Sequence, residues 1–202
     1  MKIGILGTGN LAAALAEAWS RTGHDVTVAG RSAEKTAALA ARLGVRAAAP
    51  ADLDANEVVL VAIPWDGLAE AVASAGSLTG VIIDATNPVD WATGTLLPST
   101  GSAVEQVAAL QPSARVVKAL HLYAGTSWPA PQAAGAAPKI VAMCGDDAEA
   151  LEIAGRLVTD LGGTPAVVGG LAKGRQLEEV AGFAVSLVRN GLNPIHALPS
   201  VG

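Results

Sequence analysis

Residues 1–32, MKIGILGTGNLAAALAEAWSRTGHDVTVAGRS, contain the stretch that decides the fold. An apolar run, Lys2–Leu6, is followed at once by three closely spaced small residues, Gly7, Gly9 and Ala12. A strand, a tight glycine turn and a helix in this order are typical of a dinucleotide-binding unit. In such a unit the first glycine permits the turn and the second lets the backbone approach a pyrophosphate. The small third residue lets the helix pack closely on the strand.

The start of the predicted helix, near Asn10 and Leu11, is the expected site for the phosphates. The first turn of a helix carries backbone N–H groups without intrahelical partners, and the helix dipole favours an anion there. The turn therefore predicts that a dinucleotide binds to this end of the sheet.

The second apolar run, Asp25–Ala29, is followed by Gly30, Arg31 and Ser32, and Lys35 comes one helical turn later. In an NAD-binding unit this strand ends in an acidic residue that accepts from the ribose 2′-hydroxyl. That carboxylate would repel a 2′-phosphate, whereas an arginine offers it a planar fork of donors. The sequence therefore predicts NADP(H) as the cofactor.

Farther along the chain, short apolar runs alternate with alanine-rich stretches of helical period. Leu11, Leu15 and Trp19 fall on one helical face, and a second helix is predicted over Ala33–Leu43. This alternation predicts an α/β fold, a Rossmann-type, doubly wound and mostly parallel sheet with a small C-terminal helical part. The predicted strands are Lys2–Leu6, Asp25–Ala29, Val45–Ala47, Glu57–Ala62, Gly80–Asp84, Ala114–Lys118, Lys139–Met143 and Pro165–Val168.

The chain is expected to divide into an NADP-binding Rossmann domain, residues 1–168, and a C-terminal part, residues 169–202. Residues 171–194 form one predicted helix that is apolar nearly all round. A helix of this kind is usually buried, and here a second subunit would cover it. We expect the C-terminal part to complete the substrate crevice and to form the interface of a homodimer.

Composition limits the partners and the compartment. The 202 residues are 51% hydrophobic and 15% charged, and the net charge is −5 without basic blocks. These values argue against nucleic acid or an anionic membrane as the partner. Only one cysteine, Cys144, is present, the start has no signal-peptide pattern, and no apolar run reaches roughly 18 residues. A cytoplasmic protein without membrane spans is therefore expected.

Further site residues are predicted at the ends of the fourth and fifth strands, because open α/β sheets bind ligands at the carboxyl ends of their strands. The segment VAIPWDG follows the fourth strand and DATNP follows the fifth. Asn87 would lie near the nicotinamide and exchange hydrogen bonds with its carboxamide. The cofactor-binding residues predicted here are Ile63, Pro64, Trp65, Asn87 and Pro88.

Two long loops, residues 87–100 and 122–137, are rich in Pro, Gly, Ser and Thr, and loops of this length tend to be functional. His121 and Tyr123 follow the sixth strand and are candidate catalytic residues; one of them would be the proton donor if the substrate were an imine or another small metabolite. Trp65, Trp91 and Trp128 would flank the crevice, where flat rings suit a flat ligand. No triad, metal cluster or paired-carboxylate motif is present in the sequence, so no metal site is predicted.

At this point a resemblance can be named. The segments GTGNLAAALA, GRSAEK, VAIPW, KALH, MCGDD and GRQLEEVAGFAVSLVRNG, in this order, resemble the NADPH-dependent F420 reductase family, the F420:NADP oxidoreductases. The resemblance implies a usually dimeric Rossmann protein that passes a hydride between NADP(H) and coenzyme F420, a 5-deazaflavin stacked on the nicotinamide. It implies NADP contacts at Thr8, Gly9, Asn10, Leu11, Arg31, Ser32, Lys35, Ile63 and Pro64.

The chain departs from the best-known members of that family where the second ligand would bind. They follow the leucine–histidine pair with threonine, isoleucine and proline, whereas His121 is followed here by Leu122, Tyr123 and Ala124. The segment ATNPVDWATG also differs from the proline- and valine-rich stretch that those members have there. Three alternatives stay open: a reductase of an imine or another small metabolite, a reductase of an ordinary flavin, and a non-catalytic NADP(H) sensor.

Overall fold

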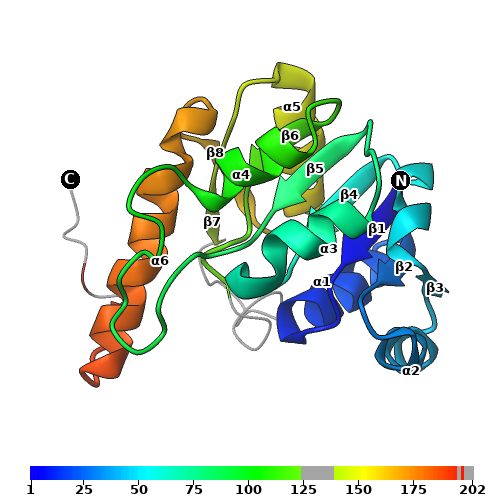
Figure 1. The fold of residues 1–202 in the computed structure, drawn as a ribbon, viewed down its shortest axis with the longest axis horizontal. Coiled ribbons are helices and arrows are strands. Elements are labelled where there is room, and N and C mark those ends of the chain that lie inside the picture. The colour runs from blue at the N-terminus through cyan, green and yellow to red at the C-terminus, as the bar shows by residue number, and fades with distance from the viewer. Residues whose placement is uncertain (124–138, 195–196, 198–202) are drawn as a thin grey trace.

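The computed structural model describes residues 1–123, 139–194 and 197. Within this part of the chain, the centre is one eight-stranded sheet with the order β3-β2-β1-β4-β5-β6-β7-β8 (Figure 1). Its strands are β1 (Lys2–Leu6), β2 (Asp25–Ala29), β3 (Arg46–Ala48), β4 (Val58–Val61), β5 (Val81–Asp84), β6 (Arg115–Lys118), β7 (Ile140–Gly145) and β8 (Thr164–Val167). Each predicted strand is present, with its ends shifted by at most two residues.

Strands β1 to β6 run parallel, and β7 pairs antiparallel with β6 and parallel with β8. The order of the strands reverses between β1 and β4, which makes the gap above these two strands the topological switch point. The predicted Rossmann-type, mostly parallel sheet is thereby confirmed. The switch point is where a ligand is expected to bind.

Helices cover both faces of the sheet. Three helices pack on one face: α1 (Asn10–Arg21), α2 (Ala33–Leu43) and α5 (Ala148–Asp160). Two helices pack on the other face: α3 (Leu68–Ser74) and α4 (Ala103–Leu110). Side chains that alternate along β1 divide between the two layers: Ile3 and Ile5 join the first core and Leu6 the second. Three short 3-10 turns, η1 (Pro50–Ala55), η2 (Trp65–Gly67) and η3 (Leu171–Lys173), and the final helix α6 (Gly174–Arg189) complete the described elements.

Local signals define α2, whose bounds match the prediction. Ser32 caps the start of the helix, because its hydroxyl oxygen accepts from the backbone N–H of Lys35 at 3.2 Å. Gly44 ends it in the left-handed conformation, with φ +68°. Trp19 of α1 is buried, as predicted, and its indole N–H donates to the carbonyl of Leu157 at 3.1 Å, which ties α1 to α5.

Helix α6 differs from the prediction in length. It ends at Arg189, before Gly191 with φ +74°, so the predicted helix over residues 171–194 was too long at both ends. Its outer side is exposed: Val180 is 40% and Phe183 50% accessible. That a second subunit covers this stripe stays a prediction; within the described chain, the sheet contacts only the other side of the helix.

The loop that follows β5 runs beside α6, as Figure 1 shows at the left of the view. Ser186 donates from its hydroxyl to the carbonyl of Thr93 at 3.3 Å. The two backbones meet at glycines, since a Cβ on Gly182 would lie only 2.3 Å from the carbonyl oxygen of Gly94. The predicted loop over residues 87–100 therefore packs on α6; most of the loop predicted over residues 122–137 lies outside the described residues.

Candidate functional site

The glycine turn after β1 has the geometry that a dinucleotide requires. Gly7 has φ +141°, its N–H donates to the carbonyl of Ala29 at 2.8 Å, and a Cβ there would lie 2.3 Å from the oxygen of Ala62. Only glycine fits this position, which joins three strands. Gly9, in contrast, faces open space, because a Cβ there would meet nothing within 4 Å. That open space above the start of α1 is where a pyrophosphate would approach the backbone.

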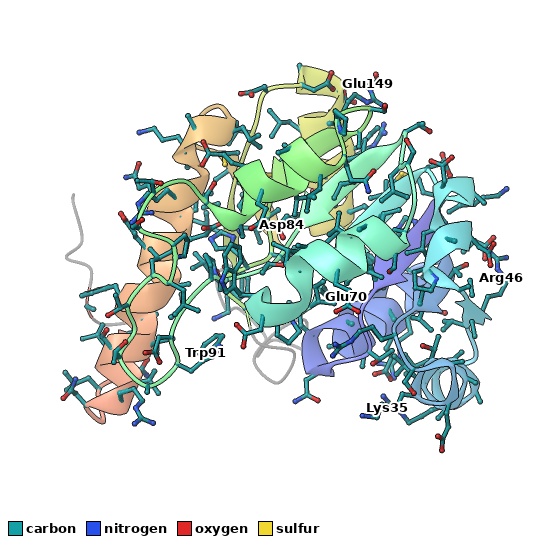
Figure 2. All side chains as sticks on the ribbon, viewed as in Figure 1. Lys35, Arg46, Glu70, Asp84, Trp91 and Glu149 are labelled. Carbon is teal, nitrogen blue, oxygen red and sulfur yellow. The ribbon has the colours of Figure 1, made fainter. Side chains whose placement is uncertain are left out.

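The residues after β2 lie beside this turn. Gly30 packs against Thr8, whose methyl group would be 3.0 Å from a Cβ at position 30. Arg31 and Lys35 are exposed, and neither side chain has a hydrogen bond or ion pair with the residues that the structure describes. Figure 2 shows Lys35 at the outer corner of the molecule near α2. Two unpaired cations thus border the expected adenosine end, where a 2′-phosphate would lie.

A cavity of about 800 Å³ extends from the glycine turn to α6. Figure 2 shows Trp91 on the loop beside α6, and its ring is 63% exposed. The lining comes from the ends of β1, β4, β5 and β6, from α6 and from the segment after it. The residues are Gly9, Asn10, Leu11, Ala62, Ile63, Pro64, Ala85, Asn87, Trp91, His121, Leu122, Tyr123, Ala181, Ala184, Val185, Val188, Arg189 and Pro194.

Eight of the predicted site residues do not line this cavity. Six of them belong to the glycine turn or to the segment after β2: Gly7, Thr8, Gly30, Arg31, Ser32 and Lys35. The other two are Trp65 and Pro88. Trp65 begins the 3-10 turn η2 and packs against the core on the α3 and α4 face. Pro88 is buried, and its carbonyl accepts from the N–H of Leu97 at 2.8 Å within the loop. Both predictions assumed that residues adjoining a strand end point into the crevice, whereas the turn rotates Trp65 onto the opposite face. Trp128 and His196 lie outside the described residues.

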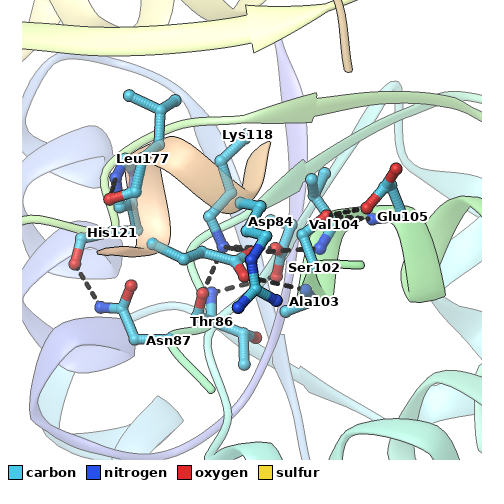
Figure 3. Close-up of polar contacts among 12 residues, drawn as sticks. Asp84, Thr86, Asn87, Ser102, Ala103, Val104, Glu105, Lys118, His121 and Leu177 are labelled. Carbon is cyan, nitrogen blue, oxygen red and sulfur yellow. Dashed lines mark hydrogen bonds and ion pairs between the residues drawn. The ribbon is translucent and has the colours of Figure 1, made fainter. Parts of the chain in front are cut away.

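Behind the cavity floor lies a buried ionic cluster, which Figure 3 shows in close-up. The ammonium of Lys118 lies 2.8 Å from Asp84 Oδ2 and 2.9 Å from Glu178 Oε1, and all three side chains are fully buried. It also donates to the carbonyl of Thr86. The cluster joins the ends of β5 and β6 to α6, since Glu178 belongs to that helix.

Glu178 has further partners at the start of α4. Its carboxylate accepts from the backbone N–H of Ala103 at 3.0 Å and of Val104 at 3.3 Å. Burial raises the pKa of the Glu178 carboxyl, while the neighbouring Lys118 ammonium acts in the opposite direction. One carboxylate thus fixes α6 against both the sheet and α4.

Sequence reasoning missed this cluster. A signal was present in part, because β5 ends in Asp84 and β6 in Lys118, each after an apolar run, and neighbouring parallel strands bring such ends together. Glu178 gave no comparable signal, since an acidic residue in a predicted helix is usually solvated.

The side chain of His121 is buried, and its imidazole ring is uncharged for the following reasons. Its Nε2 lies 3.2 Å from the carbonyl oxygen of Leu177, which only accepts, so Nε2 bears the proton. Burial, and secondarily the charge of Lys118, lower the pKa of His121 well below its ordinary value. The ring is therefore neutral at pH 7, and Nδ1 is shielded from water without a partner in the described part of the chain.

The backbone around His121 is held in an unusual shape. Leu120 has φ +65°, which costs energy for a side chain other than glycine and persists only where the surroundings fix it. The amide nitrogen of Asn87 donates to the carbonyl of His121 at 2.6 Å. The Asn87 oxygen is buried and has no hydrogen-bond partner among the described residues.

Tyr123 and Cys144 are also unsuited to proton transfer or nucleophilic attack. The Tyr123 hydroxyl donates to the carbonyl of Ile140, and burial raises the pKa of Tyr123. Burial raises the pKa of the Cys144 thiol to about 11, so it stays protonated and inert. As far as the described residues extend, the cavity lining is mostly apolar and neither His121 nor Tyr123 is poised to donate a proton to it.

Two absences hold for residues 1–123, 139–194 and 197. No group of three or more His, Cys, Asp or Glu side chains is arranged to hold a metal ion. No helix there is long and apolar enough to cross a membrane.

The glycine turn, the strand order and the cavity at the switch point define a Rossmann-type dinucleotide-binding protein. Residues 2–88 match the model of the family described as NADP oxidoreductase, coenzyme F420-dependent. This match confirms the resemblance predicted from the sequence.

Solved structures agree with this family. The chain is 28% identical to a protein of Arthrobacter sp. FB24 whose assignment as an F420-dependent NADP reductase is itself provisional; 96% of each chain is covered, with a TM-score of 0.85. It is 26% identical to the hypothetical protein SMa0349 of Sinorhizobium meliloti. The match covers 86% of this chain and 88% of the other, with a TM-score of 0.78. A reductive aminase of Aspergillus terreus, 20% identical, shares the fold alone, with a TM-score of 0.67 over 91% of this chain and 60% of the other.

One curated relative is a longer chain. The metalloreductase STEAP3 of Rattus norvegicus is 29% identical over 180 residues, which is 89% of this chain. The present chain spans only 36% of that relative's length.

Proposed function

We propose that this protein transfers a hydride between NADP(H) and the deazaflavin coenzyme F420. Support comes from the match of residues 2–88 to the F420-dependent family and from the likeness to the Arthrobacter protein. The observation that carries the proposal is that neither candidate acid, His121 or Tyr123, has a proton free for the cavity.

Among the described residues that line the cavity no side chain is an available acid, which favours a deazaflavin over an imine. A hydride that leaves C4 of the nicotinamide joins ring carbon C5 of the deazaflavin, whose ring system accommodates the charge. Reduction of an imine needs a proton at nitrogen, and general acid catalysis typically contributes about 10²–10⁴-fold. Neutral His121 and engaged Tyr123 do not provide it.

The contribution of the chain is alignment and exclusion of water. The glycine turn and α1 would hold the pyrophosphate, while Arg31, Ser32 and Lys35 would bind the 2′-phosphate. The apolar side of α6 would cover the two rings, held about 3–3.5 Å apart, so that proximity supplies most of the rate.

The deciding experiment is an absorbance assay of NADPH oxidation with purified protein and a panel of acceptors: coenzyme F420, FMN and a cyclic imine. Turnover with F420 well above that with the others is the expected result. Reduction of the imine alone would contradict the proposal. Tight NADPH binding without turnover of any acceptor would instead favour the sensor function.

Replacing the candidate acids should change turnover little. We expect His121→Asn and Tyr123→Phe to keep kcat for F420 within about tenfold of the unmodified protein, because no proton passes through them. The pH profile of kcat should show no break near the ordinary imidazole pKa of about 6.5. A loss beyond about 100-fold in a variant that still folds and binds NADPH would restore one of them as a general acid.

We further propose a homodimer formed through the outer stripe of α6. Val180, Phe183 and Leu187 recur at helical spacing on the side away from the sheet, and Phe183 is half exposed. A second copy would remove this stripe from water, at roughly 25 cal/mol per Å² before association costs. Light scattering should give twice the chain mass of 20.0 kDa. Phe183→Glu should yield monomers, and Val167→Glu, exposed on β8, should not; a monomeric unmodified protein would contradict the proposal.

A further inference from the structure

Of the described residues that line the cavity, Arg189 is the only charged one. It is the last residue of α6, it is exposed, and its guanidinium has no hydrogen bond or ion pair with the described residues. The segments 124–138 and 195–202 contain neither Asp nor Glu, so their side chains supply no carboxylate to neutralise it. Within the described part of the chain, a cation without a counter-ion thus borders a ligand cavity that has no other charged side chain in its lining.

The surroundings of Arg189 indicate what it would bind. The neighbouring positions on α6 that line the cavity, Ala184, Val185 and Val188, are apolar, and Trp91 presents a flat ring from the opposite loop. A flat ligand ring would lie on this wall. The guanidinium at its rim suits a phosphate or carboxylate, which it can bind through two parallel hydrogen bonds.

An arginine in the last turn of a helix also has an ordinary explanation, because it complements the helix dipole. Arg42 likewise lies in the last turn of its helix, α2. It is exposed and unpaired within the described structure, and it lies outside the cavity lining. The two arginines therefore share the dipole effect and differ in their access to the cavity. Arg42 is the matched control.

We propose that Arg189 binds an anionic arm of the second ligand, a phosphate or carboxylate attached to the ring that exchanges hydride with NADP(H). The identity of that ring rests on the function proposed above. The pyrophosphate of NADP(H) has its own expected place at Gly9–Leu11, and Figure 1 shows the start of α1 well apart from the C-terminal end of α6. The protein would thus distinguish acceptors by charge as well as by ring.

The test compares one deazaflavin with a ribityl side chain and the same compound carrying a 5′-phosphate. The unmodified protein should prefer the phosphate by roughly 10- to 150-fold in kcat/KM, the range of one charge-assisted hydrogen bond. Arg189→Gln should reduce this preference to within about threefold, Arg189→Lys should keep part of it, and Arg42→Gln should keep all of it. The KM for NADPH should stay unchanged throughout.

Three results would overturn the proposal: no preference in the unmodified protein, equal loss for both compounds in Arg189→Gln, or a raised KM for NADPH in that variant. The last would place the NADP(H) pyrophosphate at Arg189. If neither deazaflavin is reduced, the proposed function fails, and calorimetry of the two compounds then decides on Arg189. Equal dissociation constants would reject its role, and a phosphate preference lost in Arg189→Gln would support it.

Discussion

Lys118→Met is expected to lower the free energy of unfolding by about 3–5 kcal/mol, because it leaves two buried carboxylates, Asp84 and Glu178, without their counter-charge. For a domain of this length the melting temperature would fall by roughly 6–20 °C. Thermal unfolding followed by circular dichroism measures the effect. Lys2→Met, on the exposed start of β1, is the control and should change little.

The deficit of Lys118→Met should also depend on pH. Removing the ammonium removes the charge that opposes the effect of burial on the pKa of Glu178, so this pKa rises further in the folded variant. When a carboxyl has a raised pKa in the folded state, the folded state is most stable below the unfolded pKa of about 4.5. Its stability falls as the pH rises through the folded pKa. The deficit should therefore be larger at pH 8 than at pH 5, and Glu178→Gln in the Lys118→Met background should reduce this dependence.

A deficit that is small and independent of pH would show that water or a shifted side chain compensates the two carboxylates. Such a result would also mean that the ionic cluster is not what holds α6 against the sheet. Glu178 lies on the helix that forms one wall of the cavity. The folded fraction of Lys118→Met should therefore lose more affinity for the second ligand than for NADPH.

Arg31→Ala is expected to weaken NADPH binding by roughly 10- to 150-fold, the loss of one charge-assisted hydrogen bond of about 1.5–3 kcal/mol. Arg31 is exposed and unpaired beside the glycine turn as the structure describes it, so its removal leaves no buried group unsatisfied. NADH lacks the 2′-phosphate, and its affinity should hardly change. Titration of both nucleotides against both proteins measures the effect.

Arg42→Ala, at the other end of α2, is the control for a general loss of positive charge. Equal weakening of NADPH and NADH by Arg31→Ala would mean that Arg31 does not recognise the phosphate. The preference for NADP(H) would then have to come from Ser32 and Lys35, although Ser32 already caps α2 through its hydroxyl oxygen.

Much of the fold could be predicted because its signals are local. Gly7 has to be glycine where three strands converge, and the bounds of α2 follow from its cap Ser32 and from Gly44 within the same short stretch. Strands β4 and β5 in the middle of the sheet are buried along their whole length, so they appear in the sequence as nearly continuous apolar runs. The class of cofactor follows from the same kind of neighbouring residues, those after β1 and β2.

The interior of the site was decided only by tertiary structure. Asp84, Lys118 and Glu178 are far apart in the sequence, and each alone is typical of a solvated position; their burial depends on the simultaneous packing of β5, β6 and α6. The neutral state of His121 likewise depends on a carbonyl of α6, at Leu177. Sequence patterns record which face of an element is apolar, but the charge state of a buried group depends on which distant groups surround it. The chain alone thus determined where NADP(H) is expected to bind, and the packing of α6 decided what the cavity beside it can do.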